Sequence, residues 1–486
     1  MGSPTYSIPC GDHPGEDARP RDAGPPHRAP SLREVVFTLP QVRRVPTRNR
    51  ASNSPSGLKA PSTGSLREDR LSRYAWRREV ALSLALAKVT PQVEALAQVL
   101  ADRAIRLSGR VEEARRRLDR FSERLAELQE RVEDAIARDL GYRGARPCGE
   151  PLAVPQPLPP LPQRATLIAA DGSQIPPDRH APALYYLINV GAILIRHGSG
   201  EAPETFIEPT LIYDPEEVMV SDEQPVTAGQ VNARRDLQEI TFLAELVWTH
   251  RHEAPVIALT DGGLLFWSAL EGLSQREQGQ YHRAYLEALT KVQDAGAALA
   301  GYVDRPLSTG VVSLLHLAGL ERNRMSRAAL STHGPLAGVL DRDLFGSLLG
   351  PGERSALFVT MSPRNRDFKD YAASHEIHFF YLNVAPRREG AGQAMTPVLA
   401  RVEVPAWVAT DKALLAQVHA LIYHQCALLA ATPYPYILAR ADELAVIGGE
   451  EKRHLEMLIQ MALRERKQAA RPSAKAASKA VVRGQT

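Results

Sequence analysis

Two acidic dipeptides, each directly after a short apolar segment, are the residues of this sequence best suited to chemistry. Asp171 and Gly172 follow ATLIAA, and Asp261 and Gly262 follow PVIALT. An Asp-Gly pair alone is typical of a turn. The repetition at two apparent strand ends favours a second role, since paired carboxylates repel each other unless a cation lies between them. Mg²⁺ and Mn²⁺ prefer such oxygen ligands, so the pattern predicts a divalent-metal site.

A third carboxylate lies between the two pairs, in the segment VNARRDLQEITFLAELVWTHRH. Its apolar periodicity predicts a helix whose buried side carries Leu237, Ile240, Leu243 and Leu246. Both Glu239 and Glu245 border this stripe, and the pattern favours Glu239 only slightly. Asp171, Glu239 and Asp261 form the predicted catalytic set, in which a bound metal would activate water against a phosphodiester.

Other chemistries find less support in the sequence. His375 and His378 are three residues apart in an apparent strand, where they would point to opposite faces and make poor metal co-ligands. Ser173 and Ser308 lack the G-x-S-x-G environment of an esterase nucleophile. The chain has no G-x-x-x-x-G-K-[ST] segment, so a P-loop for ATP is not predicted.

The order of predicted elements indicates an α/β fold. Strands are expected in ATLIAAD, ALYYLINVGAILIRHG and ETFIEPTLIYD, followed by the helix above, the strand PVIALTD, another helix and the strand ALAGYVD. Three hairpin-linked strands followed by crossover helices predict a mixed sheet with flanking helices, as in RNase H-like folds. In that sheet the first and fourth strands are neighbours, which would place Asp171 beside Asp261.

The remaining chain divides by composition. Residues 1–68 are basic and proline-rich, and residues 466–486 form a second basic tail; both are expected to be disordered. Residues 70–140 predict a helical arm with a heptad seam, which would form a coiled coil or pack on its own domain. Residues 141–164 are proline-rich and predict a stiff linker. The nuclease-like domain is expected at 165–465.

Composition sets further limits on location and binding. The chain has 486 residues, a net charge of +3 and three scattered cysteines, which argue against a disulfide framework and suit a reducing cytoplasm. Neither a secretory signal nor a transmembrane run is present, so no membrane association is expected. The small net charge argues against a nucleic-acid polycation, although the basic tails could approach phosphate.

Six segments, in order, resemble the NurA family of nucleases: AADGSQIPPDRH, ALTDGGLLFW, GYVDRPLS, PGERSALF, RVEVPAWVA and YPYILARADELAVI. The resemblance covers about residues 165–450. It implies an RNase H-like nuclease that acts on DNA ends with Mn²⁺ or Mg²⁺. It also implies a homodimer that works with a HerA-type hexameric ATPase in double-strand break repair.

The resemblance also assigns roles to individual residues. It matches Asp171 and Asp261 to the family's metal ligands, and it favours Glu239 because Arg235 holds the place of a family arginine. A late metal-binding residue, usually His, corresponds to Asp442, with Glu443 as its neighbouring alternative. Arg305 and Arg401 are expected to contact DNA phosphate. Because the His is replaced, a catalytically weakened or inactive scaffold that binds DNA or a motor ATPase is the alternative.

Overall fold

The computed structural model of this chain describes residues 85–466, except 222–223, 254, 266–272, 388–395 and 430. The predicted disordered segment 1–68, the first part of the predicted arm and residues 467–486 of the basic tail lie outside the described residues.

A nine-stranded mixed sheet forms the centre of the fold, in the order β1-β9-β10-β11-β8-β7-β2-β3-β4. Its strands are β1 Ala145–Pro147, β2 Ala165–Ile175, β3 Tyr186–His197, β4 Glu204–Ile212, β7 Val256–Asp261, β8 Ala298–Val303, β9 Phe358–Thr360, β10 Ile377–Asn383 and β11 Leu399–Pro405. β7 pairs in parallel with β2 and β8, whereas β3 is antiparallel to β2 and β4. This arrangement of β2, β3, β4, β7 and β8 is the predicted RNase H-like order. A separate hairpin comprises β5 Met219–Ser221 and β6 Gln224–Pro225.

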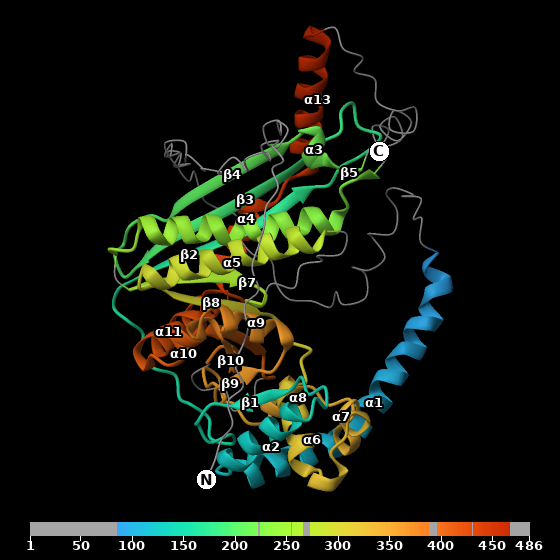
Figure 1. The fold of residues 1–486 in the computed structure, drawn as a ribbon, viewed down its shortest axis with the longest axis vertical. Coiled ribbons are helices and arrows are strands. Elements are labelled where there is room, and N and C mark those ends of the chain that lie inside the picture. Colours follow the sequence, from blue (N-terminus) through green and yellow to red (C-terminus); the bar gives the residue numbers. More distant parts are fainter. Residues whose placement is uncertain are drawn as a thin grey trace, which may run out of the picture. The chain divides into compact units, whose positions relative to one another are not determined.

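Helices cover both faces of the sheet (Figure 1). They are α1 Leu86–Phe121, α2 Leu125–Ala137, α3 Pro215–Val218, α4 Ala228–Thr249, α5 Gln275–Asp294, α6 Gly310–Gly319, α7 Arg327–Leu330, α8 Asp341–Gly346, α9 Pro363–Tyr371, α10 Ala406–Ala409, α11 Lys412–Leu428, α12 Tyr436–Ala445 and α13 Gly449–Glu465. None of the described helices has both the length and the apolar character that crossing a bilayer requires.

Side-chain alternation along β2 separates the two cores. Ile168 and Ala170 pack with α4 and α5, whereas Leu167 and Ala169 pack with α11 and α12. A strand that is covered on both faces is apolar at every position, which explains the continuous run before Asp171. Capping boxes fix where the two helices of the first core begin, with Thr227 and Gln230 at α4 and Ser274 and Glu277 at α5.

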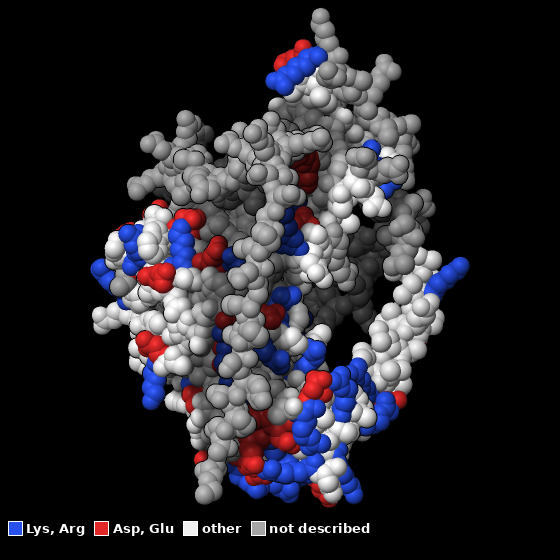
Figure 2. All heavy atoms as spheres, viewed as in Figure 1, with Lys and Arg blue, Asp and Glu red and all other residues white. Residues whose placement is uncertain are grey.

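The described part of the predicted helical arm consists of two helices, α1 and α2. A short turn separates α1 from α2, and the heptad seam packs against α6 and α8 of the same chain. The buried seam residues are Ala114, Leu118, Phe121, Leu128, Val132 and Ala135. This part of the seam is therefore not available for a coiled-coil dimer. The outer faces of both helices carry mixed charges, as Figure 2 shows at this end of the molecule, and include the pairs Arg117–Glu113 and Arg131–Glu127.

Residues 141–164, predicted to be a stiff linker, pack along the domain. They contain β1, which pairs with β9, and Gln156 forms an isolated bridge with Arg354. Leu152 is fully buried and Leu158 packs against the core. The prolines do keep the chain extended, but the apolar residues between them bury surface against the sheet, so this segment is a strap along the domain.

Replacing Leu118 by Ala should lower the free energy of unfolding by about 2–5 kcal/mol, because it leaves a cavity in the core beneath α1. Leu118 is fully buried, whereas Leu96 on the same helix is 55% exposed. Leu96→Ala is therefore the matched control and should change stability little. Urea unfolding followed by circular dichroism measures both. Equal, small effects would mean that the seam does not belong to this core.

Candidate active site

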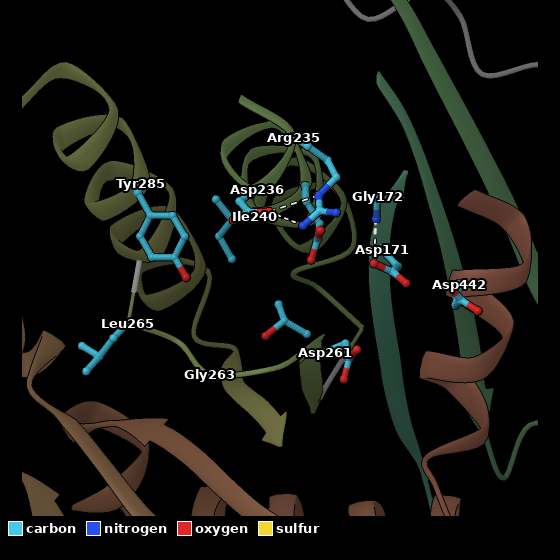
Figure 3. Close-up of a pocket in the computed structure, with 12 residues that line it drawn as sticks. Asp171, Gly172, Arg235, Asp236, Ile240, Asp261, Gly263, Leu265, Tyr285 and Asp442 are labelled. Atoms are coloured by element: carbon cyan, nitrogen blue, oxygen red, sulfur yellow. Dashed lines mark hydrogen bonds and ion pairs between the residues drawn. The ribbon is translucent and has the colours of Figure 1, made fainter. Parts of the chain in front are cut away.

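A cavity of about 390 Å³ lies where β2 continues beyond the end of β7. It receives residues from both faces of the sheet (Figure 3). Its lining consists of Asp171, Gly172, Arg235, Asp236, Glu239, Ile240, Thr260, Asp261, Gly263, Leu265, Tyr285 and Asp442. The structure thus brings Asp171, Glu239, Asp261 and Asp442 to one cavity, although their positions span more than 270 residues of sequence.

Asp171 lies within a strand and not at a turn, which corrects the expectation from its Asp-Gly dipeptide. β2 runs on to Ile175 and pairs Asp171 with Gly191 of β3, whereas its pairing with β7 ends one residue earlier, at Ala170. The Asp171 carboxylate accepts a hydrogen bond from the N–H of Gly172 at 2.8 Å. Regular strand pairing on the β3 side therefore fixes the backbone of Asp171, while the lost β7 neighbour leaves space for the cavity.

Gly172 does not form a turn; its missing side chain leaves room for α4. A Cβ at this position would lie 2.8 Å from Cγ of Arg235 and 3.3 Å from Oε2 of Glu239. The missing side chain therefore allows α4 to approach β2 closely. As a result, a carboxylate from the helix lies against the strand that carries Asp171.

The structure distinguishes the two glutamates that the helical pattern left nearly equivalent. Glu245 forms an ion pair with Lys291 of α5 at 2.5 Å, whereas Glu239 lines the cavity. Burial raises the pKa of Glu239 well above its ordinary range, and the negative charges of Asp171 and Asp236 raise it further. Glu239 is thus the helical carboxylate of this site.

Asp261 ends β7, as the sequence predicted, and a true turn follows it. Gly262 has a φ of +85°, a conformation that favours glycine. Burial raises the pKa of Asp261, a hydrogen bond from the Tyr434 hydroxyl lowers it, and the charges of Asp304 and Asp442 raise it again. Sequence reasoning did not identify Tyr434, although it begins the segment YPYILARADELAVI that carries the family resemblance.

The end of α12 is fastened to the sheet, which positions Asp442. The carbonyl of Ala445 accepts hydrogen bonds from the Ser173 hydroxyl at 2.5 Å and from the Asn189 amide at 2.8 Å. A Cβ on Gly191 would lie 2.4 Å from the Ala445 nitrogen, so only glycine allows this close approach. Asp442 faces the cavity from α12 (Figure 3).

Neighbouring residues have other partners. Glu443, the alternative to Asp442, forms an ion pair with Arg440 and does not line the cavity. Arg305 follows β8 with its side chain 84% exposed, beside Asp304. Arg401 is only 8% exposed, and its guanidinium binds Glu403 and Thr360 above the ring of Phe379. Arg401 therefore has an internal role here, because β11 is covered on both faces.

The electrostatics of the cavity fit a divalent cation. Burial raises the pKa of Asp171 to about 6; the Gly172 N–H opposes this rise, and the charges of Asp442 and Asp261 add to it. Hard carboxylate oxygens are the ligands that Mg²⁺ and Mn²⁺ prefer. As placed, no three His, Cys, Asp or Glu side chains among the described residues are grouped closely enough to hold a metal ion. The carboxylate oxygens of the cavity are therefore suitable ligands for a divalent cation. The carboxylate side chains would have to move closer together to coordinate one.

Asp171→Asn should stabilise the protein in EDTA at neutral pH. The raised pKa means that folded Asp171 binds its proton more tightly than unfolded Asp171, so stability falls as pH rises from about 4 to about 6 and stays lower above that. The amide removes this loss. We expect a Tm higher than that of the wild type by about 2 °C at pH 7.5, and little difference at pH 4.

Differential scanning calorimetry at the two pH values checks this expectation, with Asp370→Asn as a control on the exposed end of α9. A Tm that does not rise in Asp171→Asn at pH 7.5 would show that burial and neighbouring charge do not raise the pKa of Asp171 in the folded protein.

The comparisons with known proteins agree with the segment order noted in the sequence. A family model for the NurA domain matches residues 165–447. The NurA nuclease from Sulfolobus solfataricus is 11% identical, with a TM-score of 0.40, and the match covers 71% of this chain and 97% of that one. A NurA structure with manganese is 12% identical, with a TM-score of 0.33 and coverages of 72% and 99%.

The catalytic domain of human Endonuclease V is 15% identical, with a TM-score of 0.26 and coverages of 60% and 83%. Among curated proteins, no sequence matches the chain. The structural likenesses are too weak to carry an argument about the site. The family model is different, because it spans more than half of the 486 residues and includes all five carboxylates that line the cavity. The chain therefore belongs to the NurA domain family.

Proposed function

We propose that this protein is a divalent-metal-dependent nuclease that hydrolyses DNA phosphodiesters at DNA ends. The observation that carries the proposal is the convergence of Asp171, Glu239, Asp261 and Asp442 on one cavity of a NurA domain. Four acidic side chains in a partly buried space are destabilising on their own. A bound cation would offset the repulsion between these carboxylates, so a metal-dependent function accounts for their presence in one cavity.

Asp171, Asp261 and Asp442 would hold Mn²⁺ or Mg²⁺, and the bound metal would supply a nucleophilic water and neutralise charge on the phosphodiester. Glu239 lines the same cavity from α4, where burial and the charges of Asp171 and Asp236 raise its pKa well above the ordinary range. Arg235 lies beside both Glu239 and Asp171, and its charge offsets part of theirs. The Tyr434 hydroxyl interacts with the Asp261 carboxylate and lowers its pKa.

DNA and protein partners form part of the same proposal. Arg305 would contact phosphate: its side chain is exposed just after β8, next to the strand that ends at Asp261. By family resemblance, we further propose a homodimer that acts with a HerA-type hexameric ATPase in the repair of double-strand breaks, in the cytoplasm. The exposed first half of α1, which includes Leu96 and Leu100, is available for protein contacts.

Wild-type protein with Mn²⁺ should degrade linear DNA, and EDTA or Asp171→Ala should reduce cleavage to the level of a no-enzyme control. The reason is that Asp171 contributes a carboxylate from the rigid part of β2. Gel assays on end-labelled DNA measure this, with Glu443→Ala as the control outside the cavity. Cleavage that persists in Asp171→Ala would refute the assignment. A wild type that never cleaves, even with its ATPase, would favour the scaffold alternative suggested by Asp442.

Asp442→His should retain Mn²⁺-dependent cleavage, because imidazole restores the ligand type of the family at this position. Asp442→Ala should weaken Mn²⁺ binding by about 10-fold or more, since losing one ligand worth about 1.4 kcal/mol has that effect. Titration calorimetry with Mn²⁺ and cleavage rates across metal concentrations compare the two variants. Wild-type behaviour of Asp442→Ala would exclude Asp442 from the metal site.

A further inference from the structure

Glu403 of β11 is a buried carboxylate outside the cavity that binds the turn after Asp261. It is 6% exposed, and its Oε2 accepts a hydrogen bond from the N–H of Leu264 at 2.9 Å. The turn also fits closely around this carboxylate, since a Cβ on Gly263 would lie 2.9 Å from the same oxygen. Glu403 therefore fixes the position and the conformation of the turn backbone.

Two further contacts hold the same short segment. The N–H of Gly262 donates to the carbonyl of Tyr302 at 2.8 Å, and the carbonyl of Leu264 accepts from the Tyr285 hydroxyl at 2.9 Å. The turn is thus bound from β8, β11 and α5. Asp261 precedes it directly, and Gly263 and Leu265 line the cavity. A shift of the turn would move the Asp261 carboxylate.

Arg401 is the counter-ion of Glu403. It donates to Oε1 through Nε at 2.9 Å and through a terminal nitrogen at 2.6 Å, which leaves Oε2 for the turn. The same terminal nitrogen donates to Thr360 of β9 at 2.8 Å. The guanidinium lies 3.7 Å from the ring centroid of Phe379. These contacts fix the orientation of the arginine and, through it, that of Glu403.

A buried ion pair is weak evidence for stability, because apolar residues of similar volume often serve as well. Apolar residues could not accept the Leu264 N–H, however, and an unsatisfied buried N–H costs about 1–3 kcal/mol. We infer that Glu403 is a positioning residue for Asp261: it holds the turn at residues 262–265, with Arg401 as its fixed counter-ion. This inference rests on the proposed function for its consequence in catalysis, but the placement of the turn can be measured separately.

The chain contains a matched ion pair for comparison. Glu150 binds Arg354 through two hydrogen bonds of 2.8 Å and also accepts the N–H of Leu357 at 2.8 Å. Arg354 is 7% exposed and lies over the ring of Phe380. This second pair has the same chemistry and does not line the cavity. Glu150 is more exposed than Glu403, with side-chain exposures of 26% and 8%, so Glu150→Gln reports the general effect of neutralising the carboxylate of such an ion pair away from the cavity.

The test compares Glu403→Gln with Glu150→Gln by hydrogen exchange, Mn²⁺ binding and cleavage. In Glu403→Gln, we expect the peptide spanning 261–265 to exchange about 10-fold faster, because the turn opens more easily. Mn²⁺ affinity should fall by a similar factor. Glu150→Gln should leave both quantities near their wild-type values. Unchanged exchange at 261–265 in Glu403→Gln, or an equal loss of Mn²⁺ affinity in both variants, would overturn the inference.

Gly263→Ala provides a second variant should Glu403→Gln not fold. Its added Cβ pushes against Glu403 while both partners of the ion pair remain, so it should also weaken Mn²⁺ binding. Wild-type Mn²⁺ affinity in Gly263→Ala would count against the positioning role. If the wild type neither binds Mn²⁺ nor cleaves DNA, the proposed nuclease function fails, whereas faster exchange at 261–265 in Glu403→Gln would still support the anchoring of the turn.

Discussion

Crowding of negative charge in a partly buried space is the constraint on which the rest of this structure depends. Burial and mutual repulsion raise the pKa values of Asp171, Glu239 and Asp261 in the absence of a cation. Such a group of charges disperses unless the backbone prevents it. Beside the cavity, α4 and α12 each approach the sheet closely, and Gly172 and Gly191 at these two contacts make that possible.

Each acidic residue is held in place by a different element. Strand pairing with β3 holds Asp171, and close packing at Gly172 brings Glu239 to the same strand. A turn anchored from three elements follows Asp261, and α12 carries Asp442 with its end tied to β2 and β3. The backbones are therefore fixed, whereas the carboxylates as placed do not close around an ion. Movement of side chains within a fixed frame is the change that metal binding would require.

Local patterns predicted much of this arrangement. The order of strands and the placement of Asp171 and Asp261 on neighbouring strands followed from apolar runs that end in acids. The choice of Glu239 over Glu245 did not, because both border the same helical stripe; the resemblance favoured Glu239, and in the structure Glu239 lines the cavity whereas Glu245 binds Lys291. Asp442 came from resemblance alone, since its distance in sequence hides its position.

The errors in the prediction share one cause, which is contact between distant segments. Arg401 was expected to face DNA because its sequence context did not reveal that β11 is covered on both sides. The segment 141–164 was expected to be a linker because its partner, β9, lies far away in the sequence. The seam of α1 and α2 was left open between a coiled coil and packing on its own domain, because its partners, α6 and α8, are also distant in the sequence. One such distant contact has a wider meaning. Gly191 lies opposite Asp171 and directly beneath the end of α12. The absence of a side chain at Gly191 therefore sets how closely α12 approaches the sheet. It thereby sets the distance between the backbones that carry Asp171 and Asp442.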